Sequence, residues 1–290
     1  MPEGVSGGAV AMLANELVYA GGTTWRNNVK RWLAETRWYD LAGDTWRAGP
    51  SLPEPLAYGA SLQSDRSLEV LGGMNENGIS PKCWRLSAGG RDWIASGALP
   101  EGSIFGKAAI VGGRAYLFGG CTDAELNHCS NSVLQRASSG AWEKVSELPH
   151  GAVAIAAIAV VRDQIYLFGG CSRDSSTGVR NRNEAYRFNP QTNQWTALRP
   201  IPAAARGIGA VAFGERSILL AGGYTDAPGG FSDAAYVYDT KTGQYTAIGP
   251  LPLRVMGMEM FARGETIWGT GGEDKNRSRS QRLIQGILRP

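Results

Sequence analysis

The chain has 290 residues, of which 43% are hydrophobic and 19% are charged, and its formal net charge is +3. This composition supports a packed core, and there is no run of about 18 apolar residues that would predict a membrane span. The isoelectric point near 8.7 lies below the value of about 9 that is typical of nucleic-acid-binding domains, so we exclude nucleic acid as a partner. The first residues, MPEGVSGG, lack the basic and apolar segments of a secretory signal. We therefore expect a cytoplasmic location, or a periplasmic one if the chain is a mature form.

Paired glycines end a short apolar run at intervals of about 50 residues, which is in the range of a propeller blade. The first run is LVYAGG, and YLFGGC occurs twice, at 116–121 and 166–171. β-Branched and aromatic residues favour strands, and glycine permits a sharp turn where a strand ends. The pairs are Gly21-Gly22, Gly72-Gly73, Gly119-Gly120, Gly169-Gly170, Gly222-Gly223 and Gly271-Gly272.

A second repeat follows the first five glycine pairs, each time as an aromatic residue with a proline seven positions later. Another strand-like run, such as WYDL or YVYDT, precedes each aromatic residue. Each unit is therefore predicted to contain four strands, with the glycine pair after the second and the aromatic residue on the fourth. The aromatic and proline pairs are Trp46 and Pro53, Trp93 and Pro100, Trp142 and Pro149, Trp195 and Pro202, and Tyr245 and Pro252.

This double pattern resembles the kelch repeat over nearly the whole chain. The resemblance implies an all-β fold, a six-bladed kelch-type β-propeller with four antiparallel strands per blade, in which a closed ring protects the sheet edges. We expect residues 1–290 to form one domain. The alternative, a β-sandwich with accidental spacing, leaves the constant interval unexplained.

The last repeat lacks its fourth strand. The sequence finishes at GILRP (286–290), and its first residues align with the junction after a fourth strand. We therefore expect a three-stranded sixth blade with an exposed edge at RLIQGIL (282–288). Such an edge favours pairing with a second copy, as a homodimer.

Three long connections follow glycine pairs, at residues 23–38, 171–186 and 273–282, and they are expected on one face of the ring. Long connections on a rigid scaffold commonly carry function. They contain eleven Lys and Arg residues against five acids. A concave mouth of one charge concentrates ligands of the opposite charge, which predicts a small anionic ligand. The alternative is that these loops are simply polar.

Several residues of these loops are candidates for ligand binding. In the first loop an aromatic residue lies beside amides and cations, an arrangement that suits sugars and small anions. Two further candidates begin innermost strands and are expected to point into the mouth. The predicted binding residues are Trp25, Asn28, Lys30, Arg31, Tyr58, Arg180, Arg206 and Arg277.

Glu273 is the best candidate for acid–base chemistry, because the residue after the glycine pair is a carboxylate only in the sixth repeat. Beside Arg277 and Arg279 it is expected to stay ionised and to act as a base near neutral pH. The alternative is a salt bridge at the root of the loop.

Glu273 and Arg279 also resemble, in identity and spacing, a pair found in the sialic acid mutarotases, the N-acetylneuraminate epimerases. In the third-from-last blade the corresponding residues of this chain are Cys171 and Arg180. The resemblance implies an isomerase of carbohydrate metabolism that interconverts sugar anomers with Glu273 and Arg279 as catalytic residues and without a metal or other cofactor. The alternative is a non-catalytic kelch module that binds an acidic peptide or an anionic carbohydrate.

The four cysteines are expected mainly to pack in the core, as small apolar residues do. Cys121 and Cys129 also have a spacing that permits a disulfide, and His128 lies beside Cys129. One histidine and two thiols in a single loop are a weak zinc motif, so no metal is expected.

Overall fold

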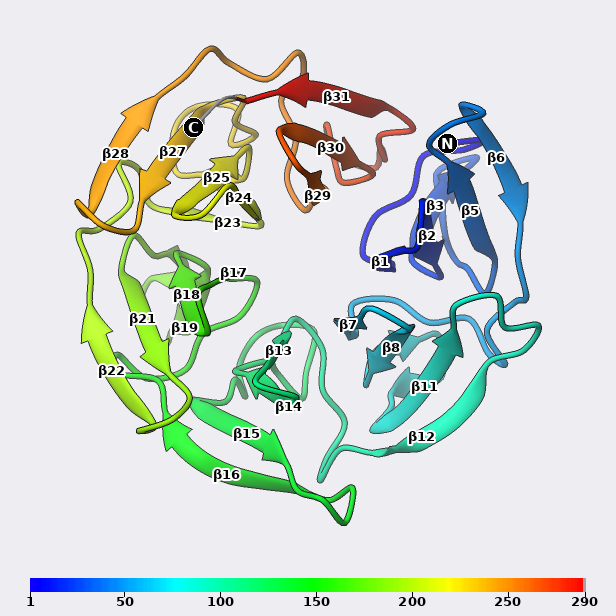
Figure 1. Ribbon diagram of the computed structural model, residues 1–290, viewed down its shortest axis with the longest axis horizontal. Helices are drawn as coiled ribbons and strands as arrows, with labels where there is room; N and C mark the ends of the chain where they lie inside the picture. The colour runs from blue at the N-terminus through cyan, green and yellow to red at the C-terminus, as the bar shows by residue number, and fades with distance from the viewer. Residues whose placement is uncertain (289–290) are drawn as a thin grey trace.

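The computed structural model describes residues 1–288, and all of their regular elements are β-strands. Six antiparallel sheets stand like blades around a central channel, and the first blade lies beside the last (Figure 1). The prediction of a six-bladed propeller is confirmed.

Blades one to three each contain four strands, ordered from the channel outward. Blade one is β1 (Ala9–Leu13), β2 (Glu16–Ala20), β5 (Thr36–Asp40) and β6 (Thr45–Ala48). Blade two is β7 (Ala60–Ser64), β8 (Ser67–Leu71), β11 (Lys82–Ser87) and β12 (Ile94–Ala98). Blade three is β13 (Lys107–Val111), β14 (Arg114–Phe118), β15 (Ser132–Arg136) and β16 (Trp142–Glu147).

Blades four and five follow the same order, whereas blade six has three strands. Blade four is β17 (Ala157–Val161), β18 (Gln164–Phe168), β21 (Ala185–Asn189) and β22 (Gln194–Ala197). Blade five is β24 (Gly209–Phe213), β25 (Ser217–Ala221), β27 (Ala235–Asp239) and β28 (Gln244–Ala247). Blade six is β29 (Glu259–Arg263), β30 (Thr266–Thr270) and β31 (Leu283–Ile287).

Short two-stranded sheets, which the sequence patterns did not predict, lie in connections outside the blades. Three are hairpins between the second and third strands of a blade, and the fourth joins two connections of blade five. They are β3 (Thr23–Arg26) with β4 (Val29–Trp32), β9 (Met74–Asn75) with β10 (Gly78–Ile79), β19 (Cys171–Asp174) with β20 (Gly178–Asn181), and β23 (Ala205–Arg206) with β26 (Tyr224–Thr225).

The apolar core lies between neighbouring blades, so each blade is stabilised by contact with the next. One cluster, for example, joins Val133 of blade three to Phe188 of blade four. Another joins Tyr19 of blade one to Phe261 and Trp268 of blade six. The ring is therefore closed by side-chain packing between its first and last blades.

The second glycine of every pair adds a backbone bond to the following blade. In blade one the N–H of Gly22 donates to the Leu56 carbonyl at 2.8 Å, and in blade six that of Gly272 donates to Val5 at 3.0 Å. A side chain at Gly272, whose φ is +91°, would lie 2.7 Å from the Met256 carbonyl oxygen. The repeat therefore needs glycine where it joins the blades.

Blade six has no fourth strand among the described residues, as the sequence predicts. Residues 1–6 do not supply one, because Val5 bonds instead to Ser280 and Gly272 in the loop before β31. The outer side of β31 is an open edge, and its Ile287 is 64% exposed.

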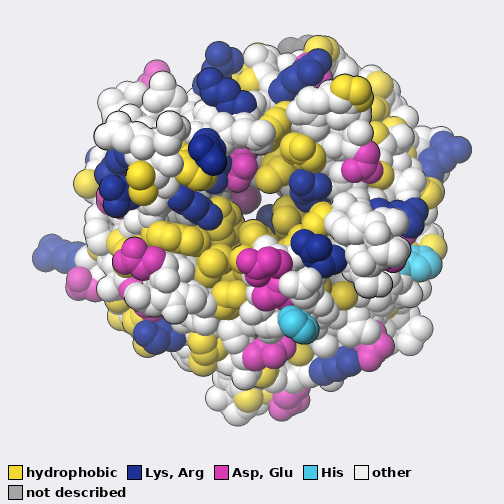
Figure 2. All heavy atoms as spheres, turned by 180° about the vertical axis from the view of Figure 1, so that it is seen from behind, with side chains coloured by type: hydrophobic (Ala, Val, Ile, Leu, Met, Phe, Trp, Pro, Cys, Tyr) yellow, Lys and Arg dark blue, Asp and Glu magenta, His cyan; other side chains and the backbone are white. Residues whose placement is uncertain are grey.

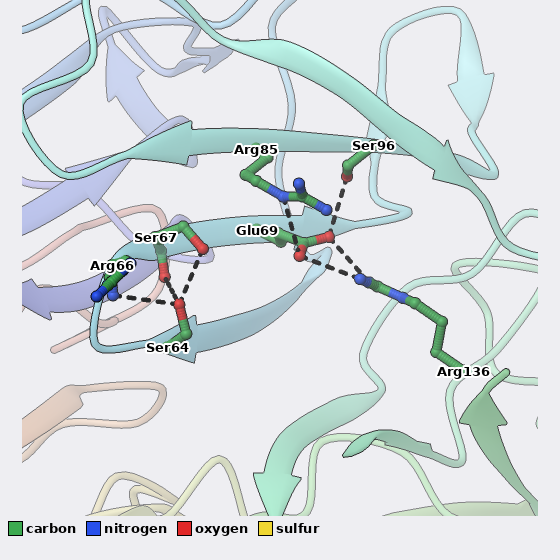
Figure 3. Close-up of polar contacts among 7 residues, drawn as sticks. All are labelled: Ser64, Arg66, Ser67, Glu69, Arg85, Ser96 and Arg136. Carbon is green, nitrogen blue, oxygen red and sulfur yellow. Dashed lines mark hydrogen bonds and ion pairs between the residues drawn. The ribbon is translucent and has the colours of Figure 1, made fainter. Parts of the chain in front are cut away.

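A buried carboxylate joins blades two and three (Figure 3). Glu69 of β8 accepts hydrogen bonds from Arg136 of blade three, at 2.8 and 3.1 Å, and from Arg85 and Ser96 of its own blade. Burial raises the pKa of Glu69, but the hydrogen bonds and charge of Arg136, with the charge of Arg85, outweigh it and hold the pKa below its usual value. Removal of either partner would therefore leave a buried charge.

The expected packing role is confirmed for Cys83, Cys121 and Cys171, which are buried among apolar residues. Cys83 and Cys171 are free thiols, and burial raises the pKa of Cys171 to about 11. Cys121 and Cys129 form the disulfide that their spacing permits, and they pack in one apolar cluster with Cys171. They are linked because their backbones already pair in an antiparallel bridge at the base of the loop.

Candidate functional site at the channel mouth

A ring of six residues with left-handed backbone conformations forms the lip of the channel. Each precedes the innermost strand of its blade by two residues, and their φ angles lie between +55° and +71°. The residues are Gly7, Tyr58, Phe105, Ile155, Gly207 and Gly257.

A belt of backbone hydrogen bonds connects these lip residues from blade to blade. The N–H of Tyr58 donates to Gly7 at 2.7 Å, that of Phe105 donates to Tyr58 at 2.9 Å, and the series continues to Gly257. Left-handed conformations are costly for aromatic and β-branched residues and occur often at functional sites. The lip thus places Tyr58, Phe105 and Ile155 on one side of the opening and glycines on the other.

A cavity of about 560 Å³ runs through the channel below this lip. Its walls come from the innermost strands and are mainly Ala, Gly, Ile, Val and Met, and Tyr58 and Glu273 line its entrance. Figure 2 shows the face opposite to that of Figure 1, with apolar side chains around the central opening and Lys and Arg side chains on several sides. The volume suits a small molecule.

Glu273 is held at the mouth by the same backbone bridge that recurs in every blade. Its N–H donates to Met256 at 2.8 Å, and the Met256 N–H donates back at 2.9 Å. Burial raises the pKa of Glu273, and the charges of Arg279, Lys30 and Arg206 only partly offset this rise. The pKa of Glu273 is thus raised, whereas the neighbouring arginines alone would lower it. A carboxyl group with a raised pKa is suited to transfer protons.

Arg279 pairs with Glu273, with 3.2 Å between Nη2 and Oε1, and its side chain is 5% exposed. Its guanidinium also contacts the hydroxyl of Thr23 at 3.3 and 3.4 Å, and that hydroxyl lies 3.3 Å from the hydroxyl of Tyr58. Arg279 is therefore largely enclosed by the protein and orients Glu273. Thr23 was not predicted as a site residue, although it follows a glycine pair just as Glu273 does.

Two predicted cations lie beside this group. The ammonium of Lys30 is 4.4 Å from the ring centre of Trp32 and 4.9 Å from that of Tyr58. Neither Tyr58 nor Arg206 begins an innermost strand as predicted. Tyr58 is a lip residue before β7, and Arg206 precedes the lip residue Gly207 and belongs to β23. Its guanidinium stacks on Tyr224 at 4.3 Å and donates to Asn181 at 2.8 Å.

The other predicted binding residues lie farther out, on two hairpins and on the loop between β30 and β31. Arg277 is exposed and stands 5.8 Å from the ring of Trp25. Asn28 and Arg31 are exposed on the β3–β4 hairpin, and Arg180 is exposed on β20. The structure thus brings together Glu273, Arg279, Tyr58 and Lys30, with Arg206 beside them. The five outer residues stay at the rim: Trp25, Asn28, Arg31, Arg180 and Arg277.

Some of the arginines in the three long loops are neutralised by nearby acids, one of which lies outside the loops. Glu3 pairs with both Arg26 and Arg37, each at 2.8 Å, and Arg182 pairs with Glu184. The positive character of the mouth therefore comes mainly from Lys30, Arg206 and the cations of the rim.

An ion pair across the channel was also missed by the sequence patterns. Lys107 begins β13 in blade three and Glu259 begins β29 in blade six, on opposite sides of the ring, and their charged atoms are 3.8 Å apart. Both residues line the cavity. Lys107 follows the FG of IFGKAAI (104–110), and Glu259 holds the corresponding place in MGMEM (256–260).

Within residues 1–288 we find no group of three or more His, Cys, Asp or Glu residues arranged to hold a metal ion. His128 lies on the surface, with its Nδ1 3.2 Å from an oxygen of Asp123. The same residues contain no helix with the length and hydropathy needed to cross a membrane.

The fold and mouth define a six-bladed propeller with polar side chains around one end of an apolar channel. The model of the KLHDC2/KLHL20/DRC7 Kelch-repeats domain matches residues 106–284, and the chain belongs to this kelch-repeat family.

Individual relatives differ in how much of the chain they match. Kelch-like protein terF of Aspergillus terreus is 24% identical over 75% of this chain and 50% of its own length. Kelch-like protein 35 of Mus musculus is 28% identical over 73% of this chain and 35% of its own length. N-acetylneuraminate epimerase of Yersinia enterocolitica is 34% identical over 34% of this chain and 26% of its own length. The chain thus spans half or less of each of these relatives.

Proposed function

We propose that the channel mouth binds a small carboxylated sugar of the sialic acid class and interconverts its anomers. The observation that carries the proposal is the position of Glu273, a partly buried carboxyl group that lines the cavity and pairs with Arg279. Its burial raises its pKa. The partial similarity to N-acetylneuraminate epimerases supports the substrate class.

In this proposal Glu273 acts as the base. It removes the proton of the anomeric hydroxyl while an acid protonates the ring oxygen, so the ring carbon–oxygen bond breaks and a ketone forms. The open chain then rotates about the single bond next to the ketone carbon. The hydroxyl that was the ring oxygen adds back to either face of the ketone, and the two protons return. The hydroxyls of Tyr58 and Thr23, which lie 3.3 Å apart beside Arg279, are placed to relay the second proton.

Charge and shape determine the ligand class. Lys30 and Arg206 provide positive charge at the entrance, where a carboxylate would be attracted. The aromatic ring of Tyr58, with the Lys30 ammonium 4.9 Å from its centre, adds apolar surface beside this positive charge, as sugar sites commonly do.

The test is NMR of freshly dissolved sialic acid, whose approach to anomeric equilibrium is followed with and without the protein. We expect catalytic amounts of protein to accelerate that approach, and Glu273→Gln to reduce the acceleration by about 10²–10⁴-fold, since Gln keeps the shape but accepts no proton. An unchanged relaxation rate with folded protein would contradict the proposal.

A second candidate is non-catalytic binding of an acidic peptide or anionic carbohydrate at the same mouth. It is favoured by the wider coverage of the two relatives named as Kelch-like proteins. Saturable binding of sialic acid without any change in anomer exchange would identify this function instead.

A further inference from the structure

The first residues of the six innermost strands form a ring of side chains just below the lip. Each follows the lip residue of its blade by two positions, so the six occupy matching places in the channel wall. Two of them are long and charged, Lys107 in blade three and Glu259 in blade six. The other four are small: Ala9, Ala60, Ala157 and Gly209.

Lys107 and Glu259 meet across the cavity. Blades three and six stand on opposite sides of the ring (Figure 1), yet Nζ of Lys107 is 3.8 Å from Oε1 of Glu259. The two side chains are 32% and 25% exposed, and both line the cavity. Because the other four residues of this ring are small, they leave room for the two long side chains to cross the channel below the mouth.

Most of the hydrogen-bonding capacity of this pair is not used by the protein. A separation of 3.8 Å is too long for a hydrogen bond, and within residues 1–288 neither charged group forms one with another residue. An ammonium group donates in several directions, and a carboxylate accepts through both oxygens. The pair therefore presents both donors and acceptors to the cavity.

Two other polar side chains of the channel wall, by contrast, are occupied by the backbone. The hydroxyl of Ser61 accepts from the N–H of Val10 at 3.1 Å. The amide of Gln63 accepts from the N–H of Met12 and donates to its carbonyl, both at 3.1 Å. Both residues line the same cavity. Lys107 and Glu259 are thus better placed than these side chains to hold a polar part of a ligand inside the channel.

The chemistry of the pair matches a hydroxyl group. Its two charges sum to zero, so an ion of either sign would be attracted by one member and repelled by the other. A hydroxyl can accept from Lys107 and donate to Glu259 at the same time. Since the charged atoms are 3.8 Å apart, a single hydroxyl oxygen can lie about 2.8 Å from both.

The pair is also close enough to Glu273 for one small molecule to reach both. The backbone of Glu273 is bonded to Met256, and Glu259 is only three residues farther along the chain. Three extended residues span at most about 11 Å. Glu273, Lys107 and Glu259 all line the same cavity.

We propose that Lys107 and Glu259 bind the hydroxylated side chain of a sugar acid whose anomeric centre lies at Glu273, an inference that rests on the proposed function. In a sialic acid the carboxylate is on the anomeric carbon, and the hydroxylated side chain is on the carbon at the other side of the ring oxygen. The carboxylate then stays among the cations of the mouth, and the side chain enters the channel. The pair thereby selects sugar acids that carry such a side chain.

The test compares sialic acid with an analogue whose side chain has been shortened by periodate cleavage and then reduced with borohydride. Both sugars are titrated into the full chain by calorimetry. We expect the unmodified protein to bind the intact sugar at least about tenfold more tightly, because a hydrogen bond to a charged group corresponds to about ten- to hundredfold in affinity.

A double variant tests the two residues directly. Lys107→Met combined with Glu259→Met keeps long side chains at both positions and leaves no unpaired charge in the channel. We expect it to bind the two sugars with affinities within about twofold of each other, since the charged partners of the hydroxyls are gone. The matched control, Lys144→Met with Glu147→Met, removes a pair of the same residue types from the outermost strand β16. It should keep the preference for the intact sugar.

Equal affinity of the unmodified protein for the two sugars would overturn the inference, and this comparison does not depend on the folding of a variant. A double variant that retains the preference, even if it weakens both sugars, would overturn it as well. Either result leaves sugar binding at the mouth intact. If neither sugar bound to the unmodified protein, the proposed function and this inference would both be wrong.

Discussion

The residue that follows each glycine pair has the same backbone bridge in all six blades, yet its chemistry differs from blade to blade. The bridge joins Thr23 to Ser6 in blade one and Glu273 to Met256 in blade six. This scaffold holds whatever side chain the repeat supplies at the rim of the channel. A carboxylate at this position therefore needs no special backbone, only its neighbours Arg279 and Lys30.

The raised pKa of Glu273 is directly measurable. We expect carbon-13 NMR of the labelled carboxyl group to give a pKa above the ordinary value of 4.5, because burial disfavours the charged form. Arg279→Met should raise the pKa further, since it removes the closest positive charge. A pKa at or below 4.5 in the unmodified protein would show that the arginine outweighs burial.

Arg206 and Arg277 are expected to contribute unequally to the affinity for a ligand. Arg206 stands beside the mouth, held by Asn181 and Tyr224, and Arg277 is exposed at the rim. We expect Arg206→Ala to weaken a carboxylated sugar about 10-fold or more, since a hydrogen bond to a charged group contributes about 1.5–3 kcal/mol. Arg277→Ala should change the affinity less than about threefold in the same calorimetric titration. If both variants lost affinity equally, the two arginines would act through the overall positive charge of the mouth and not through direct contact with the ligand.

At the scale of elements, the blades meet mainly through apolar clusters, and Glu69 is the most buried carboxylate among the salt bridges of the described residues. It lies on β8 and receives Arg136 from β15. Surface pairs such as Arg47 with Glu16 are more exposed and connect strands of one blade. The two kinds of pair are therefore expected to contribute differently to stability.

Glu69→Ala should lower the free energy of unfolding by about 3–5 kcal/mol, because it leaves Arg136 without its buried partner. Glu16→Ala, the matched control, should cost less than about 1 kcal/mol. Denaturant unfolding followed by tryptophan fluorescence measures both. Similar losses would indicate that Glu69 is solvated in the folded protein.

The stabilisation by Glu69 should also depend on pH. Its folded pKa is lowered, so its contribution is complete above the unfolded value of about 4.3 and is lost as the pH falls through the folded value. The stability difference between the unmodified protein and Glu69→Gln should therefore narrow in acid. A difference that stayed constant down to pH 3 would contradict the lowered pKa.

At the scale of the whole molecule, a small net charge of +3 coexists with a local concentration of cations around one end of the channel. Several basic side chains of the loops are paired with acids, as Arg37 is with Glu3. The attraction for an anion therefore comes from a few unpaired cations close to the axis. Such an attraction is screened by salt when the charges are exposed.

Affinity for a carboxylated sugar should accordingly fall as sodium chloride is raised from 0.05 to about 0.5 M, where the screening length is roughly halved or less. The corresponding neutral sugar alcohol should bind weakly and with little dependence on salt. Calorimetric titration of both ligands is the measurement. If the affinities of the carboxylated sugar and of the neutral alcohol changed equally with salt, recognition of the carboxylate by charge would be excluded.

The sequence predicts the architecture because the repeat encodes it six times. Glycine pairs mark the blade junctions, and even the open edge of blade six follows from the missing aromatic residue. The site was harder to predict, because Thr23, Lys107 and Glu259 become neighbours of distant residues only when the ring closes. The burial that raises the pKa of Glu273 is likewise a property of the closed ring and has no signature in the local sequence.

The belt of backbone bonds at the lip does not depend on the side chains that the lip residues carry. Its bonds run from Gly7 through Tyr58 and on to Gly257 and use main-chain atoms alone. The hairpins β3–β4 and β19–β20 lie in sheets of their own, outside the blades. Exchange of a hairpin between related propellers is therefore expected to change which ligand binds while the belt stays intact.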